Sequence, residues 1–410
     1  MLYGAMLPKT ALTLALTAAL LLLGACWSPT APRNIGRIEG LGWPTTLFGL
    51  VLLTGALSLT PFAPGGAHPV WSYVGLSPGS ATLDRSQTEL ELLKLLGLAT
   101  LFALGLCVGQ SDGRTRAAVG ALVGIGGAIA GWSFLAWASG AGGVGRQRLG
   151  GPFEGPNTAA TLFGWLLVIS VGLAMAQFRS APRGRVFSRT APLAAAALLF
   201  LFCLLATASR GGFLATAAGL LTLILLQLAS RRTSWSKATI GLLIGVTLLA
   251  ASIVLGGDLL VDRLLAQDID KDARRVMFQA HWETFKGAPL MGYGLGTFDT
   301  VNRLILDALN LRELWNVRAA HNVYLTWLQQ AGLLGALPMF GAIAACIGLT
   351  ARNTFRRSRM TTLLFALLAA NVVILVHGVT DFALETYSMA AMWSFILGLQ
   401  LAASAGSSRR

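Results

Sequence analysis

Three arginines stand at positions where a cationic side chain could bind phosphate. Arg210 lies between two apolar runs, in Ala208-Ser-Arg-Gly-Gly212, and Arg274 and Arg275 are adjacent in a long polar segment. A planar guanidinium makes bidentate, charge-assisted hydrogen bonds to phosphate oxygens, and the glycines after Arg210 allow a ligand to approach the backbone closely. Two simpler readings stay open: Arg210 could snorkel to lipid headgroups, and the paired arginines could form a solvated helix face.

A histidine supplies a second kind of chemistry. His321 lies in Arg318-Ala-Ala-His-Asn322-Val-Tyr324, where Arg318 is three residues earlier and would share its helix face. Histidine titrates near neutral pH, so it can deprotonate or orient a hydroxyl group. A lone histidine at a helix start is more often structural. Asn322 and Tyr324 are weaker candidates for shaping a pocket or binding sugar.

The rest of the chain must position these groups in a membrane. Its 410 residues are 55% hydrophobic and 12% charged, with a mean hydropathy of +0.67. Soluble domains carry about 25% charged residues, so the composition excludes a water-soluble enzyme, a coiled coil and a disordered chain. The predicted fold class is all-α, a polytopic membrane protein. Four cysteines lie in apolar runs without paired spacing, which predicts neither a disulfide nor a metal site.

Eleven apolar stretches approach the length of about 20 residues that a bilayer crossing needs. They run approximately over residues 9–27, 44–62, 90–109, 117–138, 158–178, 191–209, 211–229, 238–256, 322–350, 361–379 and 387–404.

Lys and Arg residues gather on one side of these spans. Of the 31, 17 fall with only two acidic residues in the loops at 28–43, 110–116, 179–190, 230–237 and 351–360 and in the tail from 405. The positive-inside rule makes this side cytoplasmic, so the N-terminus is predicted outside. The net charge of +14 is then a topology signal and predicts no nucleic-acid partner. The run Leu22-Leu-Gly-Ala-Cys26 resembles a lipoprotein cleavage site, but cleavage would upset the alternation, so we expect an uncleaved first helix.

One long segment lies on the outer side, at residues 257–321. It separates helices 1–8 within residues 1–256 from helices 9–11 within residues 322–410, and all three parts are predicted to form one membrane domain. Long loops without structure of their own are uncommon and often functional.

Two stretches of this segment have the apolar periodicity of amphipathic helices. They are residues 272–286, with Phe278, Trp282 and Phe285 on one stripe, and residues 300–312. Between the two stretches, Pro289 and the glycines of Gly292-Tyr-Gly-Leu-Gly296 predict a tight turn.

Two motif lookalikes are set aside on context. Asp268-Ile-Asp270 resembles the metal-binding pair of nucleotide-sugar transferases, but no soluble α/β domain is encoded. The glycines of 292–296 follow no parallel strand, which excludes a dinucleotide fingerprint. The sequence has no Walker loop, zinc spacing or Gly-x-Ser-x-Gly, so no metal or other cofactor is expected.

The motifs resemble the O-antigen ligase and O-antigen polymerase superfamily of bacterial envelope glycosyltransferases, and they run in the family's order over most of the chain. They are Trp71–Pro78, Gly151–Asn157, Ser209–Gly212, Arg274 with Pro289–Phe298, Ala320–Gly335 and His377–Asp381. Each piece alone is weak, whereas their order and the long outer loop make the match fairly specific. Members similar to ligases usually have twelve spans with a cytoplasmic start, while eleven are counted here.

The resemblance implies a GT-C-like, metal-independent glycosyltransferase in the bacterial inner (cytoplasmic) membrane, with its active site facing the periplasm. The implied donor is an undecaprenyl-diphosphate-linked glycan and the implied acceptor is lipid A-core. Arg210, Arg274 and His321 correspond to the family's functional residues, with Arg275 as the alternative to Arg274.

Asn157 and Asp381 join Asn322 and Tyr324 as weaker candidates for substrate binding. Ligation to lipid A-core is the favoured reaction. A polymerase that extends O-antigen or exopolysaccharide on its own carrier is the first alternative, and glycan transfer to protein is a further one. A polytopic transporter or flippase is the alternative from another class, but the candidate groups gather at one face, which suits an enzyme better.

Overall fold

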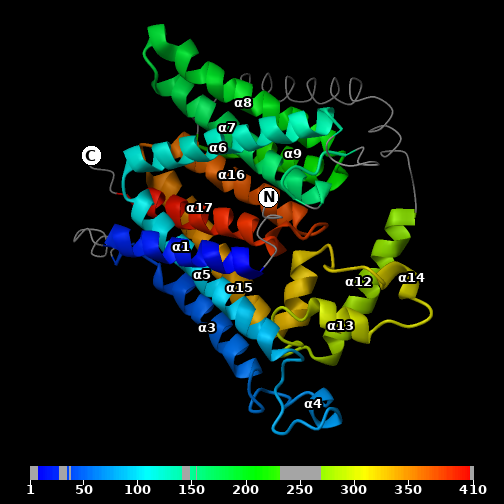
Figure 1. Ribbon diagram of the computed structural model, residues 1–410. Helices are drawn as coiled ribbons and strands as arrows, with labels where there is room; N and C mark the ends of the chain where they lie inside the picture. Colours follow the sequence, from blue (N-terminus) through cyan, green and yellow to red (C-terminus); the bar gives the residue numbers. More distant parts are fainter. Residues whose placement is uncertain are drawn as a thin grey trace.

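A computed structural model describes residues 8–26, 35–36, 38–140, 148–153, 155–230 and 269–406. Every regular element in these ranges is helical (Figure 1). The helices are α1 (Pro8–Cys26), α3 (Gly42–Ser58), α4 (Val70–Tyr73), α5 (Arg85–Gly109), α6 (Asp112–Ala138), α7 (Pro156–Ser180), η2 (Arg183–Arg185), α8 (Val186–Ala206), α9 (Arg210–Ala229), α12 (Ile269–Gly287), α13 (Phe298–Leu304), α14 (Leu311–Leu314), α15 (Val323–Arg356), α16 (Thr361–His377), η3 (Ala383–Glu385) and α17 (Tyr387–Ala405).

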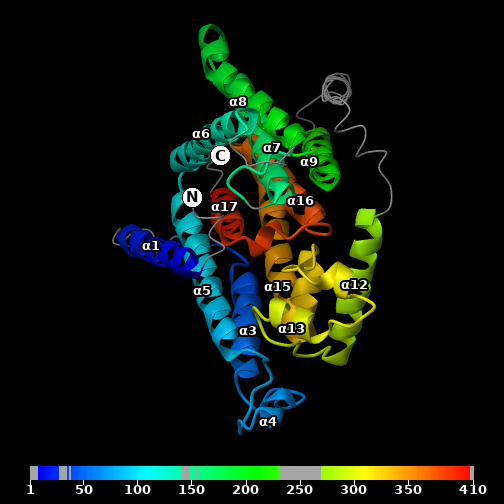
Figure 2. The ribbon, with the colours of Figure 1, turned by 45° about the vertical axis from the view of Figure 1, so that its right-hand side comes forward.

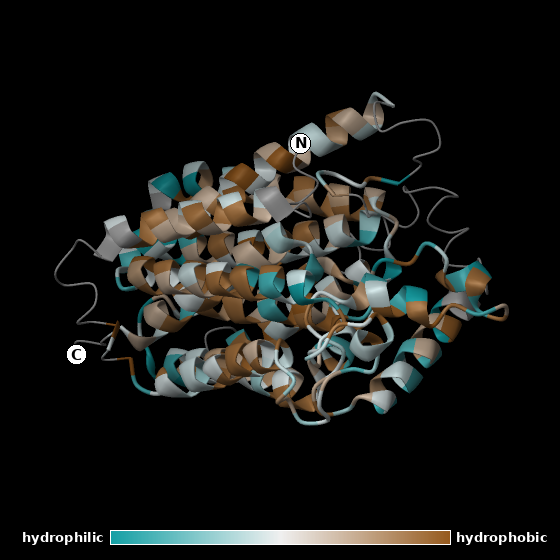
Figure 3. Ribbon diagram, turned by 60° about the horizontal axis from the view of Figure 1, so that its bottom comes forward, coloured by the Kyte–Doolittle hydropathy of each residue, from teal (hydrophilic) through white to brown (hydrophobic). Residues whose placement is uncertain are grey.

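The all-α prediction for a polytopic membrane protein is confirmed. Within the described ranges, seven helices are long and apolar enough to cross a membrane, namely α5, α6, α7, α8, α9, α15 and α17. Shorter apolar helices occur within α1 and at α3 and α16. Hydrophobic residues run along these helices, and hydrophilic ones are more frequent in the loops and near helix ends (Figure 3). Ten of the eleven predicted spans match a helix, and the span at 238–256 lies outside the described residues.

Helices α7 and α16 form the centre of the bundle (Figures 1 and 2). Their side chains, with those of α8, α9 and α17, make the largest apolar cluster, which includes the fully buried Phe163, Trp165 and Phe365. Glycines bring the helices into close backbone contact, as at Gly398 of α17, where a Cβ atom would lie 2.0 Å from the Phe102 carbonyl oxygen of α5. Small residues at such crossings are typical of membrane bundles.

The loops predicted to share one side do meet at one end of the bundle. Arg357, which follows α15, pairs with Asp112 at the start of α6. It also donates hydrogen bonds to the carbonyl of Ala403 in the last turn of α17 and to that of Gly406, which follows α17. Arg352 pairs with Glu39 at 3.4 Å. These contacts join loops that are far apart in the sequence, as the charge pattern predicts. We call this the Arg357 end.

Helix α15 is broken near its start. Gly332 has φ 56° and ψ −168°, and the carbonyls of Gln329 and Gln330 accept hydrogen bonds from Tyr293 and Gly294 at 3.0 and 2.9 Å. The predicted glycine turn therefore inserts into the break and satisfies carbonyls that lose their helical partners. Irregular backbone of this kind is tolerated at membrane depth where protein buries it.

The first amphipathic helix of the outer segment is confirmed as α12, which lies along the first part of α15 (Figure 2). The second is wrong in extent, since α13 ends at Leu304 and α14 begins only at Leu311. The Asp307 carboxylate accepts from the amides of Leu309 and Asn310, both at 2.8 Å. This side-chain turn competes with helical hydrogen bonding and leaves Leu309 91% exposed.

Candidate functional site

Several helix termini gather at the end opposite the Arg357 end. The N-terminus of α15 docks on the turn after α16, where the Val323 amide donates to the Gly378 carbonyl at 2.9 Å. The first turn of α9 meets the same turn, because a Cβ atom on Gly211 would lie 2.8 Å from Thr380 Oγ1. Helix N-termini carry partial positive charge and unpaired amides. The arrangement thus favours negative charge at this end.

His321 is held in an unusual backbone conformation at this junction. Its φ is 49°, and the next residue, Asn322, caps α15 by accepting from the Leu325 amide at 3.0 Å. The imidazole packs edge-on against Phe382, with ring centroids 4.7 Å apart. Its Nδ1 atom is buried with no hydrogen-bond partner among the described residues. A non-glycine residue with positive φ is uncommon and indicates that the surroundings impose the conformation.

The electrostatic surroundings keep His321 neutral. Burial, together with the positive charge of Arg274, lowers its pKa to about 4. Both effects disfavour the imidazolium form. At neutral pH the ring can therefore accept a proton or a hydrogen bond from a hydroxyl group.

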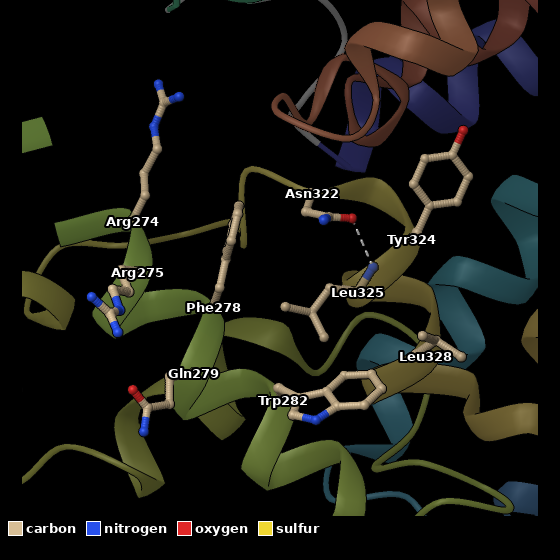
Figure 4. Close-up of a pocket in the computed structure, with 9 residues that line it drawn as sticks. All are labelled: Arg274, Arg275, Phe278, Gln279, Trp282, Asn322, Tyr324, Leu325 and Leu328. Atoms are coloured by element: carbon tan, nitrogen blue, oxygen red, sulfur yellow. Dashed lines mark hydrogen bonds between the residues drawn. The ribbon is translucent and has the colours of Figure 1, made fainter. Parts of the chain in front are cut away.

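Arg274 and Arg275 do not face the same way. The two side chains extend from α12 in different directions, with that of Arg274 on the side of the α16–α17 segment (Figure 4). The charge of Arg274 acts on His321 and on Asp381, while Arg275 is exposed. Geometry and electrostatics thus associate Arg274 with His321.

A buried polar network lies behind His321. Thr161 Oγ1 of α7 lies 2.7 Å from Nδ1 of His377 and donates to Asp381 Oδ2 at 3.5 Å. Asp381 is fully buried, and burial raises its pKa to about 6 against the opposing effects of the Phe382 and Ala383 amides, Thr161 and Arg274. Its Oδ1 atom has no partner among the described residues. Thr161 and His377 were missed as site candidates, although His377 stands in the quoted motif.

Arg210 is the first residue of α9 and is exposed. Ser209 caps this helix by accepting from the Gly212 amide at 3.2 Å. The glycines after Arg210 do not open a path for a ligand as the sequence reading expected. A Cβ atom on Gly211 would lie 3.0 Å from His377 Nε2, so these glycines let α9 pack against α16. Arg210 therefore directly precedes Gly211, the residue at which α9 meets the His377–Asp381 turn.

Asn157 and Arg148 connect the loop before α7 to the start of α9. Arg148 donates to the Thr207 carbonyl at 2.7 Å and to Asn157 Oδ1 at 3.1 Å. Asn157 therefore takes part in holding the turn that precedes Arg210. Arg148 was not predicted, and its only signal is a position three residues before the quoted motif Gly151–Asn157.

A pocket of about 700 Å³ lies between α12 and the first part of α15 (Figure 4). Four of the predicted site residues line it, namely Arg274, Arg275, Asn322 and Tyr324. Most of the other lining side chains are apolar. The Tyr324 hydroxyl itself points out of the pocket and donates to the Leu375 carbonyl at 2.7 Å. The structure brings Arg274, Asn322 and His321 together, whereas Arg318 is exposed, and neither it nor Arg210 lines this pocket.

In the part of the chain that the structure describes, no group of three or more His, Cys, Asp or Glu side chains could hold a metal ion. The expectation of a metal-independent site stays a prediction. The donors that converge here are guanidinium groups and helix amides, which suit an anion.

Residues 195–340 match a family model described as O-antigen ligase. The chain carries an O-antigen ligase family domain. The predicted superfamily of O-antigen ligases and polymerases is thereby confirmed, and a ligase- or polymerase-type, glycosyltransferase-like activity follows. Arg210, Arg274 and His321 all fall in the O-antigen ligase domain, whereas Thr161, His377 and Asp381 lie outside it. No curated protein matches the chain.

Proposed function

We propose that this protein transfers a glycan from an undecaprenyl-diphosphate-linked donor to lipid A-core, as an inner-membrane enzyme whose site faces the periplasm. The observation that carries the proposal is the electrostatic effect of Arg274, which lines a pocket, on a neutral His321, which immediately precedes the pocket residue Asn322. The family match supports the reaction type. The donor, the acceptor and independence of metal ions are parts of the proposal.

Stabilisation of the leaving diphosphate is the first requirement of this reaction. Arg274 supplies a guanidinium at the pocket, and Arg210 begins α9 beside the His377–Asp381 turn. The N-termini of α9 and α15 add partial positive charge. Preorganised charges of this kind stabilise a developing anion without a metal ion.

Activation of the acceptor hydroxyl is the second requirement. In the proposed step the hydroxyl oxygen forms a bond to the anomeric carbon, and the bond from that carbon to the diphosphate oxygen breaks with its electron pair leaving on the diphosphate. The hydroxyl proton passes to His321, which is neutral for the reasons given above. Direct displacement inverts the configuration at the anomeric carbon.

A lipopolysaccharide gel on a deletion strain tests the proposal. The strain is complemented with wild type, Arg210→Ala, Arg274→Ala or His321→Ala at matched protein levels, and lipid-linked glycan is extracted in parallel. The control is Arg312→Ala, because Arg312 is exposed and does not line the pocket. Loss of the O-antigen ladder with accumulation of long lipid-linked polymer supports ligation. A ladder reduced to core plus one repeat identifies a polymerase instead. An unchanged ladder in the His321 variant contradicts the proposed role, and saturable flux of substrate in proteoliposomes would identify a transporter.

A further inference from the structure

One wall of the pocket carries aromatic rings that the transfer chemistry does not use. Arg274, Phe278 and Trp282 occupy successive i, i+4 positions on α12, so they share one face and follow one another by about 6 Å along the helix axis. Both rings project from α12 towards α15 (Figure 4). Trp282 is 46% exposed, and its ring lies 5.2 Å from that of Phe285. Phe278 is half-buried and packs against the cluster that holds Phe298 and Leu325. The result is an aromatic wall along the pocket that is most exposed at Trp282.

Polar groups alternate with these rings. Gln279 and Asn322 both line the pocket. Asn322 uses its Oδ1 atom to cap α15, which leaves its amide N–H groups available, and Gln279 is exposed on α12. Leu325 and Leu328 complete the opposite side. The groove therefore offers flat apolar faces and hydrogen-bonding amides within the same short length.

This mixture of groups favours a saccharide over an acyl chain. A sugar ring has an apolar C–H face that can stack on an aromatic ring and hydroxyl groups around its edge. An acyl chain would cover the amide groups of Gln279 and Asn322 without forming hydrogen bonds to them, which costs free energy. The arginine at one end also suits a glycan whose first sugar carries a diphosphate.

We propose that the groove between α12 and the start of α15 binds the saccharide part of the substrate, with Phe278 and Trp282 stacking on successive sugar rings and Gln279 and Asn322 bonding their hydroxyls. The inference rests on the proposed function in placing the diphosphate at Arg274. It goes beyond that function because it assigns a separate glycan subsite to residues that take no part in bond breaking. The rise of about 6 Å along α12 between the positions of Phe278 and Trp282 is on the scale of one sugar unit.

A direct binding measurement tests the subsite without requiring transfer. The probe is the producing cell's own glycan, released from its lipid diphosphate by mild acid, and the receptor is the full-length protein in nanodiscs, observed by saturation-transfer NMR. We expect Trp282→Ala to weaken binding about five- to tenfold, the scale of one aromatic stacking contact. Trp282→Phe keeps a ring and should retain most of the affinity. Trp315→Ala is the matched control, since Trp315 is 72% exposed and does not line the groove.

The other outcomes overturn the inference. Binding of the released glycan to Trp282→Ala with wild-type affinity, or no binding to wild type, excludes a glycan subsite here. Displacement of the glycan by undecaprenyl phosphate, which has no saccharide, identifies the groove as a lipid site. Weaker affinity in Trp315→Ala than in Trp282→Ala would place the glycan elsewhere. If the wild-type protein transfers no glycan while Trp282→Ala still loses glycan binding, the proposed function fails and the subsite stands. If transfer stays intact in Arg274→Ala and His321→Ala, only the proposed roles of these two residues fail.

Discussion

The guanidinium of Arg274 acts on the imidazole of His321 although the two residues belong to different helical elements. Arg274 lies in α12, and His321 immediately precedes the cap of α15. The positive charge of Arg274 adds to burial in lowering the pKa of His321 to about 4. A residue suited to binding an anion thus also keeps the adjacent candidate base in its neutral form.

The adjacent arginines should differ sharply in their effect on transfer. Arg274→Ala is expected to lower the rate of glycan transfer by about 10²–10³-fold, the usual cost of removing one preorganised stabilising group. Arg275→Ala should lose much less, because the charge that acts on His321 is that of Arg274 and the two side chains extend in different directions (Figure 4). Initial rates with purified lipid-linked donor in detergent provide the measurement. Equal losses in the two variants would contradict the assignment.

The acid limb of the pH profile should lie near the lowered pKa of His321. Activity requires neutral His321, so kcat/KM should fall only as the pH drops towards about 4. In Arg274→Ala the limb should move to higher pH, because the charge that lowers the pKa is gone. A wild-type limb close to the ordinary histidine value would refute this expectation.

The same pKa shift affects stability. The pKa of His321 in the folded state lies below the ordinary histidine value of 6.5. Between these two values the unfolded chain binds a proton that the folded chain does not. The contribution of neutral His321 to the free energy of unfolding is therefore present above about pH 6.5 and is lost as the pH falls towards about 4. His321→Gln should flatten the fall of the melting temperature over this window.

Glu385 should make the protein less stable as the pH rises. Burial, with the charges of Asp381 and Glu91, raises the pKa of Glu385 to about 8. The ordinary pKa of a glutamate carboxyl is 4.5. Between that pH and about pH 8, the folded state holds a proton that the unfolded state has lost, so stability falls with rising pH. Glu385→Gln removes this dependence. Its melting temperature should exceed that of wild type by more at about pH 8 than at about pH 5.

An exposed carboxylate provides the control for Glu385. Glu39 has a side chain that is 82% exposed and pairs loosely with Arg352 at 3.4 Å. Glu39→Gln should leave the pH dependence of the melting temperature unchanged. The same difference at both pH values in Glu385→Gln would mean that this carboxyl is not buried in its neutral form.

The break in α15 should depend on a single glycine. A Cβ atom at Gly332 would lie 2.2 Å from the Leu290 carbonyl oxygen, and the residue has φ 56°. Gly332→Ala should therefore unfold the protein or destabilise it severely. Gly348→Ala in the same helix, where nothing lies within 4 Å of the added atom, should be neutral or stabilise by up to about 1 kcal/mol. Thermal unfolding of both variants in nanodiscs distinguishes them, and equal melting temperatures would refute the role of the break.

The amino-acid sequence by itself determined the helices and the superfamily. Apolar runs of bilayer length predict spans because every backbone group in lipid must be satisfied within its own segment. Ten of the eleven predicted spans therefore coincide with helices. The charge pattern also correctly grouped the loop that holds Arg352 and Arg357 with the loops that hold Glu39 and Asp112. The ordered motifs predicted the superfamily for a similar reason, since they consist of residues close together in the chain.

Only the tertiary structure decided which of these residues meet. The association of Arg274 rather than Arg275 with His321, the link from Thr161 to His377, and the break at Gly332 all join elements that are distant in the chain. Periodicity describes one helix at a time, whereas burial, charge and hydrogen bonding act across the bundle. Local interactions can also override periodicity. At Asp307, a side-chain turn interrupts a helix that apolar spacing alone predicts to continue.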